Sequence, residues 1–180
     1  DTNFLTIDYK VLDGLAELIE NSGLPINLYI ETRPEGINPL SIELLKKLQV
    51  DGVGMGVEVS SENFRKNNLN RFPAQKKIIN AFSLLKDANI KRTAYNIIGL
   101  PNETEDMILD TIRFNSILDP DNITVAFYSP YLGTNLQVES KEIGDFNDYE
   151  YNVDNQLRTV TKSSTIDKET LNSIGNEGRK

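Results

Sequence analysis

Four polar residues that could bind a ligand stand at or near the ends of predicted strands. Glu31 ends an apolar strand, Glu58 ends a glycine-rich strand, and Asn96 lies three residues before a turn at Gly99. Arg71 follows the glycine-rich strand and offers a planar cation that can pair with a carboxylate. Because side chains alternate between the faces of a strand and parallel strands end at one edge, we expect Glu31, Glu58 and Asn96 to converge there.

Two carboxylates, an amide and a guanidinium suit a zwitterionic ligand that also carries hydroxyl groups. One carboxylate would bind its ammonium group, the guanidinium its carboxylate, and the remaining acid and the amide its ribose. The same set suits proton transfer less well, and no obvious nucleophile accompanies it. Each acid and amide taken alone also fits a structural role, and Arg71 also fits an ordinary solvated surface position.

A column of glycines leads to the carboxylate of Glu58. Gly52, Gly54 and Gly56 share a strand face with Glu58, because strand side chains alternate. Glycine weakens a strand, so its presence indicates a bend, a ligand against bare backbone, or a large neighbouring side chain. The ligand and the large neighbour both remain open here. The segment is not a dinucleotide-binding fingerprint, because Val57 stands where the third glycine of GxGxxG belongs.

The elements that would position these residues alternate along the chain. Apolar residues at helical spacing predict helices, and β-branched segments bounded by glycine or proline predict strands. We expect helices over residues 8–21, 38–49, from Pro73 onward, and 103–118, and strands over residues 27–31, 52–57, 91–98 and 123–128. Strict alternation favours a parallel sheet with right-handed crossovers, so the predicted fold class is α/β with the units of one barrel-like sheet.

The composition excludes several kinds of site and partner. The 180 residues carry 19 Lys and Arg against 27 Asp and Glu, and this net charge of −8 argues against nucleic acid or anionic membrane as a partner. The absence of Cys and His excludes zinc sites and Cys or His nucleophiles, so residues outside this sequence would have to hold any metal cluster. No apolar run approaches the roughly 20 residues of a membrane span, and no signal peptide precedes Asp1, so we expect a cytoplasmic protein.

The two ends of the chain differ in character. Residues 1–136 carry the helix and strand pattern of one domain, or of part of a larger one. Because Asp1 is not an initiator Met and a helical pattern follows at once, we expect the chain to be cut from within a larger domain. Residues 137–180 are polar and aromatic, and we expect a covering segment, a short helix over residues 167–174 and a frayed tail.

Short motifs mark the strand ends and turns of the first 136 residues. They are Asp1-Thr2-Asn3-Phe4, Glu31-Thr32-Arg33-Pro34, Gly54-Met55-Gly56-Val57-Glu58, Leu69-Asn70-Arg71, Ile97-Ile98-Gly99-Leu100-Pro101 with Glu103-Thr104, and Pro130-Tyr131-Leu132-Gly133-Thr134. In this order and spacing they resemble the radical S-adenosylmethionine (SAM) enzymes. The likeness is closest to the subgroup that often carries an N-terminal cobalamin-binding domain.

The resemblance implies a partial TIM-type (β/α) barrel that lacks its first two strands. Strands three to six of the family would lie within residues 1–136, while strands one and two and the CxxxCxxC cluster loop would lie upstream. The implied cofactors are S-adenosylmethionine and a [4Fe-4S] cluster, with cobalamin in an upstream domain where the subgroup carries one. In the family these cofactors supply radical chemistry, either hydrogen abstraction from a substrate or methylation.

The resemblance also implies binding roles, while it leaves the catalytic residues unknown and places no metal ligand in this chain. Glu31 would lie near the methionine amino group and Arg71 at the methionine carboxylate. Glu58 and Asn96 would lie near the ribose. The segments that would place backbone near the adenine contain Ile98, Gly99 and Tyr128.

Two residues depart from the family pattern. Asn102 replaces the usual glycine after Leu-Pro, and we expect this to be tolerated because Asn adopts left-handed backbone conformations readily. Leu132 replaces the proline of the family's Pro-Tyr-Pro-Gly-Thr motif, which should loosen that turn.

Two functions of different classes fit these observations. In the first, the chain is a fragment of a radical SAM enzyme that acts on an unknown substrate and is inactive alone because its cluster loop is absent. In the second, it is a cluster-free half-barrel that binds a nucleotide-like ligand or a protein partner. An ordinary hydrolase or aldolase fits less well, because the sequence lacks His and Cys and has no lysine at a strand end in the proposed site. The strand over residues 27–31 would be an open sheet edge, so we also expect dimerisation there.

Overall fold

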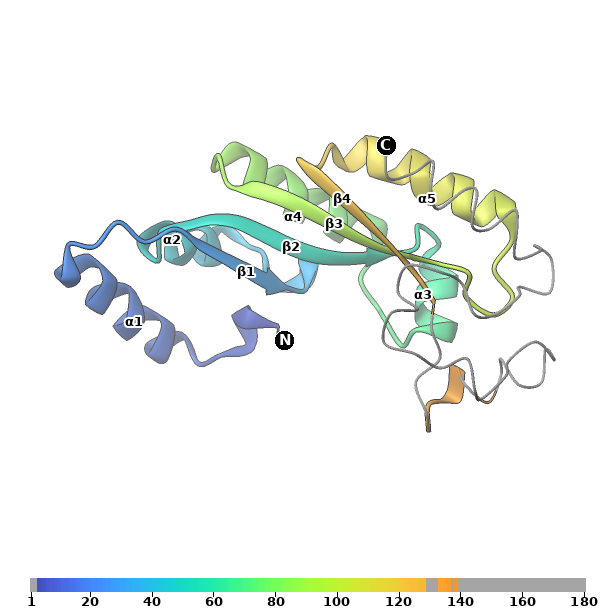
Figure 1. Cartoon of the computed structure of the whole chain (residues 1–180), viewed down its shortest axis with the longest axis horizontal. Helices are drawn as coiled ribbons and strands as arrows, with labels where there is room; N and C mark the ends of the chain where they lie inside the picture. The colour runs from blue at the N-terminus through green and yellow to red at the C-terminus, as the bar shows by residue number, and fades with distance from the viewer. Residues whose placement is uncertain (1–2, 129–132, 137, 139–180) are drawn as a thin grey trace. The chain divides into compact units, whose positions relative to one another are not determined.

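The computed structural model describes residues 3–128, 133–136 and 138 (Figure 1). Its elements alternate between helix and strand, which confirms the predicted α/β class. In chain order they are η1 (Phe4–Thr6), α1 (Tyr9–Ser22), β1 (Leu28–Thr32), η2 (Pro34–Gly36), α2 (Pro39–Lys47), β2 (Val50–Glu58), α3 (Glu62–Asn68), α4 (Gln75–Asp87), β3 (Lys91–Ile98), α5 (Glu105–Leu118) and β4 (Asn122–Phe127). The strands run in parallel and pair in the order β1-β2-β3-β4.

The helix ends follow local sequence signals. Asn38 caps α2, because its side-chain Oδ1 accepts hydrogen bonds from the backbone N–H groups of Leu40 and Ser41, and Pro39 occupies the first turn. Gly23 ends α1 in the left-handed conformation with a φ of 63°. Both caps are local signals in the sequence, and they fix where α2 begins and where α1 ends.

One helix was not expected from the sequence. The polar segment Glu62–Asn68 forms α3, which Ser61 caps by accepting a hydrogen bond from the Phe64 N–H at 3.2 Å. The prediction that Pro73 opens the following helix is wrong, because α4 begins at Gln75 after an extended Ala74. The segment that follows β2 therefore folds into its own short helix before α4 starts.

The chain divides into two compact units. One comprises Asp1–Val57, Pro73–Ala94 and Asn115–Ile123, and we call it unit 1. The other comprises Glu58–Phe72, Tyr95–Phe114 and Thr124–Lys180, and we call it unit 2. We expected a boundary between residues 1–136 and 137–180, and this remains a prediction. All of residues 137–180 except Val138 lie outside the described residues, and so does the short helix expected over residues 167–174.

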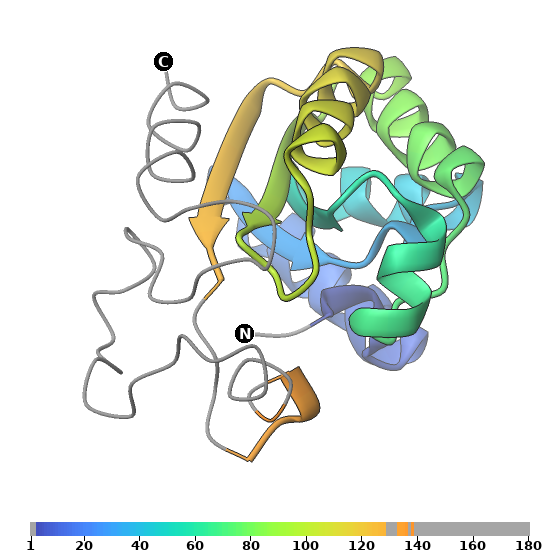
Figure 2. The ribbon, with the colours of Figure 1, turned by 90° about the vertical axis from the view of Figure 1, so that its right-hand side faces the viewer.

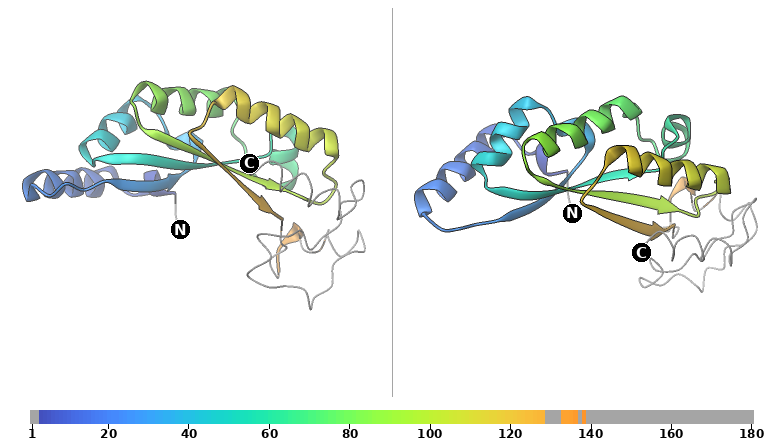
Figure 3. Two further views of the ribbon diagram at one scale, coloured as in Figure 1. Left: turned by 45° about the horizontal axis from the view of Figure 1, so that its top comes forward. Right: turned by 90° about the horizontal axis from the view of Figure 1, so that it is seen from above.

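Within unit 1, α2 and α4 lie on the same face of the strands and contact each other (Figure 3). Their apolar stripes supply the core, and the buried residues are Ile42, Leu45, Leu48, Ile78, Phe82 and Leu85. Helix α1 contacts α2, and its buried residues are Leu12, Ala16 and Ile19.

The β1–β2 pairing explains one of the glycines that precede Glu58. A Cβ at Gly52 would lie 2.8 Å from Cδ2 of the Tyr29 ring, and Gly52 is the register partner of Tyr29. The bulky neighbour is therefore the correct explanation at this position. Gly54 pairs with Glu31, two residues further along the same strands.

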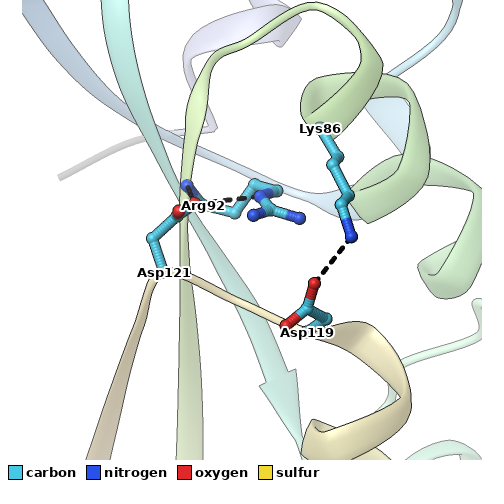
Figure 4. A network of polar contacts seen from close by, with 4 residues as sticks. All are labelled: Lys86, Arg92, Asp119 and Asp121. Carbon is cyan, nitrogen blue, oxygen red and sulfur yellow. Dashed lines mark hydrogen bonds and ion pairs between the residues drawn. The ribbon is translucent and has the colours of Figure 1, made fainter.

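Unit 1 also contains a network of charged residues between α4, β3 and the turn before β4 (Figure 4). The Arg92 side-chain Nε and backbone N both donate to Asp121, at 2.9 and 2.8 Å, and Lys86 donates to Asp119 at 2.7 Å. These contacts hold the pKa of both aspartates below the usual value, chiefly through the side-chain hydrogen bonds from Arg92 and Lys86.

Within unit 2, α5 packs against the carboxyl ends of β3 and β4 (Figure 2). Ile98, Ile108 and Phe127 form one buried cluster. A second buried cluster joins the segment after β2 to the ends of β3 and β4, and its members are Val59, Phe64, Leu100 and Tyr128. None of the helices in the described residues is both long and apolar enough to cross a membrane.

Candidate functional site

Glu58 and Arg71 form an ion pair in unit 2. The Arg71 Nη2 lies 3.4 Å from the Glu58 Oε1, and the guanidinium is about one third exposed while the carboxylate is mostly buried. The pair therefore places opposite charges side by side where one of them still reaches solvent. This is the part of the predicted site that the structure brings together.

The backbone at Glu58 has an unusual conformation for a residue with a side chain. Glu58 is the last residue of β2 and has a φ of 64°, in the left-handed region that costs a non-glycine residue roughly 1–2 kcal/mol. Such outliers persist only where surrounding contacts fix them, and they are frequent at binding sites. The end of β2 is therefore a strained position that carries a carboxylate.

Two residues fix the turn that follows Glu58. The Arg65 guanidinium, buried in α3, donates to the carbonyl oxygens of Val59 and Ser60, the second at 2.6 Å. From α5, the Thr111 hydroxyl oxygen accepts a hydrogen bond from the Ser60 N–H at 3.0 Å and donates to the Met107 carbonyl. The turn is thus held from two helices of unit 2.

Asn96 is buried on β3 and lies on the face that packs against α5. Strand alternation gives Asn96 and Ile98 the same face, and Ile98 packs against Ile108 of α5. Ile97, on the opposite face, packs against the second cluster. The expected contact of Asn96 with a ribose remains a prediction.

The residues expected near an adenine also make contacts within the protein. The Ile98 carbonyl accepts a hydrogen bond from the Tyr128 N–H at 2.8 Å. The Gly99 N–H donates to the Glu103 Oε2 at 2.6 Å, so this donor is already engaged. The Tyr128 side chain is buried in the second cluster.

Glu103 lies before α5, although we expected it at the start of a helix over residues 103–118. Its carboxylate accepts hydrogen bonds from the N–H groups of Gly99 and Leu100, whereas the first turn of α5 is capped by Thr104, whose hydroxyl accepts from the Met107 N–H. Burial raises the pKa of Glu103 to about 7, against the opposing effect of those two hydrogen bonds. The Glu103 carboxyl group therefore fixes the conformation of the turn at Gly99.

The turn at Asn102 confirms one expectation. Asn102 has a φ of 62°, in the left-handed region where glycine is common. Gly99 has a φ of 82° in the same loop. The departure from the family pattern at Asn102 is therefore compatible with the backbone that the loop adopts, whereas Leu132 lies outside the described residues.

Glu31 lies near the end of β1 in unit 1, where a separate contact set orders the strand end. Asn3 Oδ1 accepts hydrogen bonds from the Thr32 hydroxyl at 2.6 Å and from the Arg33 N–H at 3.0 Å. The segment that begins with Asn3 therefore lies against the end of β1. The contact of Glu31 with an amino group remains a prediction.

Arg65, Thr111 and the turn-holding role of Glu103 were not found from the sequence. Arg65 lies in a helix with no apolar repeat, so nothing in the pattern marks it as buried. The available signal was Ser61, a good capping residue followed by an acid, which could have revealed α3 and hence the inward side of Arg65.

Comparison with known proteins gives one family match. A model of the radical SAM superfamily matches residues 6–114, which is more than half of the chain. No curated protein matches the chain.

Several solved structures have the same fold. The radical SAM methyltransferase TsrM from Kitasatospora setae, with cobalamin and a [4Fe-4S] cluster bound, has a TM-score of 0.65 at 13% identity, over 76% of this chain and 26% of that one. Coproporphyrinogen III oxidase (HemN) from Escherichia coli, a radical SAM enzyme, has a TM-score of 0.63 at 18% identity, over 84% and 35%. Elp3 from Methanocaldococcus infernus has a TM-score of 0.59 at 20% identity, over 86% and 43%.

The chain spans less than half the length of each of these structures. At these identities the likeness concerns the fold, and it confirms that the parallel strands and helices form part of a TIM-type barrel.

Proposed function

The chain belongs to the radical SAM superfamily, and on that basis we propose that it is the C-terminal part of a radical SAM catalytic domain that binds S-adenosylmethionine through Glu58 and Arg71. The observation that supports this most directly is the Glu58–Arg71 pair at the end of β2. When bound, S-adenosylmethionine and a [4Fe-4S] cluster supply radical chemistry, used for hydrogen abstraction or methylation.

The charges of the pair fit the methionine end of S-adenosylmethionine. A guanidinium presents a planar fork of donors that suits a carboxylate, and Arg71 keeps enough exposure to reach one. The Glu58 carboxylate would accept hydrogen bonds from a ribose hydroxyl. The long, single contact between Glu58 and Arg71 would be exchanged for contacts to the ligand.

The residues of the chain do not fit the cluster itself. The sequence contains no Cys or His, and the described residues include no group of three or more potential metal ligands. We therefore propose that residues outside this sequence hold the cluster, and that the chain alone is catalytically inactive. Cobalamin use is proposed from the subgroup resemblance, and a cytoplasmic location remains a prediction from the sequence.

Titration of the ¹⁵N-labelled chain with S-adenosylmethionine tests the proposal. Saturable shifts at Glu58 and Arg71, and an affinity about tenfold lower in Arg71→Ala, are expected for loss of a charged hydrogen bond. Arg113→Ala, which removes an exposed arginine of unit 2 paired with Asp110, serves as the matched control and should bind like the wild type. Wild-type affinity in Arg71→Ala would contradict the assignment.

The absence of Cys also favours a second function, a cluster-free half-barrel that binds a nucleotide-like ligand or a partner. Tight binding of S-adenosylmethionine by the isolated chain, in place of the weak binding expected from part of a site without its cluster, would favour this module. The coding sequence upstream of Asp1 separates the two functions, because the enzyme requires three cysteines at CxxxCxxC spacing there.

We also propose that β1 pairs with a second copy of the chain. β1 is at the end of the strand order in the described residues, and Tyr29 on it is exposed. Edge strands readily accept another strand, and a lysine on the edge opposes this. Light scattering should show a dimer that Tyr29→Lys dissociates, and a monodisperse wild-type monomer would refute the proposal.

A further inference from the structure

Arg65 is a buried charged residue whose side chain forms hydrogen bonds to the turn after β2. It is 1% exposed and donates to the carbonyl oxygens of Val59 and Ser60. A buried guanidinium is costly to the fold unless it is well hydrogen-bonded, and an apolar residue at this position of α3 would fill the same space without that cost. The presence of arginine therefore calls for a reason beyond packing.

The backbone of Arg65 contacts the other half of the site. Its carbonyl oxygen accepts a hydrogen bond from the Arg71 N–H at 3.0 Å and another from the Leu69 N–H at 3.1 Å. Asn70, with a φ of 51°, turns the chain so that the Arg71 N–H can reach back to α3. One residue thus contacts the segment next to Glu58 with its side chain and the segment of Arg71 with its backbone.

Glu58 needs such support because its own conformation is unfavourable. The left-handed φ of Glu58 directs the chain into the Val59–Ser60 turn, and both carbonyl oxygens of that turn accept from Arg65. Both hydrogen bonds come from the same nitrogen, Nη1. This nitrogen stands one bond further from the backbone than the Nζ of a lysine, so the reach of arginine is what lets one side chain in α3 bind both carbonyls.

We infer that Arg65 is a positioning residue for ligand binding, which holds the turn after β2 so that the Glu58 carboxylate faces Arg71. The inference rests on the proposed function of Glu58 and Arg71. It adds that ligand affinity depends on a guanidinium in α3 that does not itself touch the ligand.

Two variants of α3 separate positioning from stability. Arg65→Lys keeps the charge, but its Nζ stands one bond closer to the backbone than Nη1 of Arg65, so it should not reach both carbonyl oxygens. Phe64→Leu is the matched control, because it weakens the second cluster of unit 2 without removing a hydrogen bond to the turn. The chain and both variants are titrated with S-adenosylmethionine by NMR, and amide hydrogen exchange at Ser60 is measured in urea concentrations that give the variants equal global stability.

Arg65→Lys should bind S-adenosylmethionine about tenfold more weakly than wild type and exchange the Ser60 amide faster, whereas Phe64→Leu should change neither. Wild-type affinity in Arg65→Lys, or an equal loss in Phe64→Leu, would overturn the inference. If the wild-type chain does not bind S-adenosylmethionine, its proposed function fails. The rate of Ser60 amide exchange then tests separately whether Arg65 holds the turn. Faster exchange in Arg65→Lys alone supports the role of Arg65 in holding the turn, and unchanged exchange refutes it.

Discussion

Two arginine–carboxylate pairs of this protein have the same chemistry in opposite surroundings. In unit 1, Arg92 is 8% exposed and its partner Asp121 is 39% exposed, with two hydrogen bonds of 2.8 and 2.9 Å. In unit 2, Arg71 is 33% exposed and its partner Glu58 is 12% exposed, with one contact of 3.4 Å. In the first pair, Arg92 is buried and forms short hydrogen bonds. In the second pair, Arg71 remains accessible to solvent.

The pKa values of carboxyl groups in the two units also shift in opposite directions. Hydrogen bonds from Arg92 and Lys86 lower the pKa of Asp121 and Asp119, whereas burial raises the pKa of Glu103 in unit 2 to about 7. Unit 1 therefore places its charges where they stabilise the fold. Unit 2 holds a strained Glu58 and a buried Glu103, both unfavourable for stability, at the loops where a ligand site is proposed.

The pH dependence of stability should show the largest effect. The folded-state pKa of Glu103 lies above its unfolded value of 4.5, so its protonated form stabilises the protein fully below about pH 4.5. That contribution is lost as the pH rises through 7 and amounts to about 3 kcal/mol. Urea unfolding at pH 5 and 7.5 should show this decline in the wild type and not in Glu103→Gln. The exposed Glu105→Gln is the control, and an equal decline in Glu103→Gln would show that another group is responsible.

Removing the carboxylate of the buried pair should cost the next largest amount. Asp121→Ala leaves the Arg92 guanidinium in a buried position without its bonded carboxylate, and we expect a loss of about 2 kcal/mol in the free energy of unfolding. Asp119→Asn breaks an exposed ion pair in the same turn and keeps a residue type that tolerates the left-handed φ of 48°, so it should cost much less. Equal losses in the two variants would remove the distinction between buried and exposed charges in unit 1.

The fold was largely predictable because its signals are local. β3 was predicted over the same residues that form it, since β-branched residues precede the Gly99 turn. Asn38 with Pro39 gave the start of α2 for the same reason. α3 could not be found by periodicity, because its seven residues carry no apolar repeat and its one large apolar residue, Phe64, packs against residues distant in sequence in the second cluster.

The site was predictable only in part, because the burial of a side chain and the strand face that a helix covers depend on the tertiary structure. Glu58 and Arg71 were expected in one ligand site, and the structure pairs them. For Asn96, alternation gave its companions on the strand, but β3 is largely buried on both faces, so the pattern did not reveal which face α5 covers. Glu103 was placed in the helix from its charge, whereas the Gly99 and Leu100 N–H groups draw it back to the turn.

Relief of backbone strain at Glu58 should raise the free energy of unfolding, by less than the losses expected above. Glu58→Gly removes the penalty of the left-handed backbone, while Glu58→Ala keeps it, so the glycine variant should be about 1 kcal/mol more stable than the alanine variant. Both lack the carboxylate and should lose S-adenosylmethionine affinity alike. Urea unfolding and NMR titration give the two quantities, and equal stability of the variants would show that Glu58 is unstrained.

Loss of the exposed cation should have the smallest effect on stability. Arg71→Ala removes one long contact at a partly exposed pair, so the free energy of unfolding should change by about 0.5 kcal/mol or less. Since Asp121→Ala is expected to cost several times more, urea unfolding of the two variants compares the pairs directly. A loss in Arg71→Ala as large as in Asp121→Ala would mean that Arg71 serves the fold as Arg92 does, and its exposure would then no longer support a role in holding a ligand.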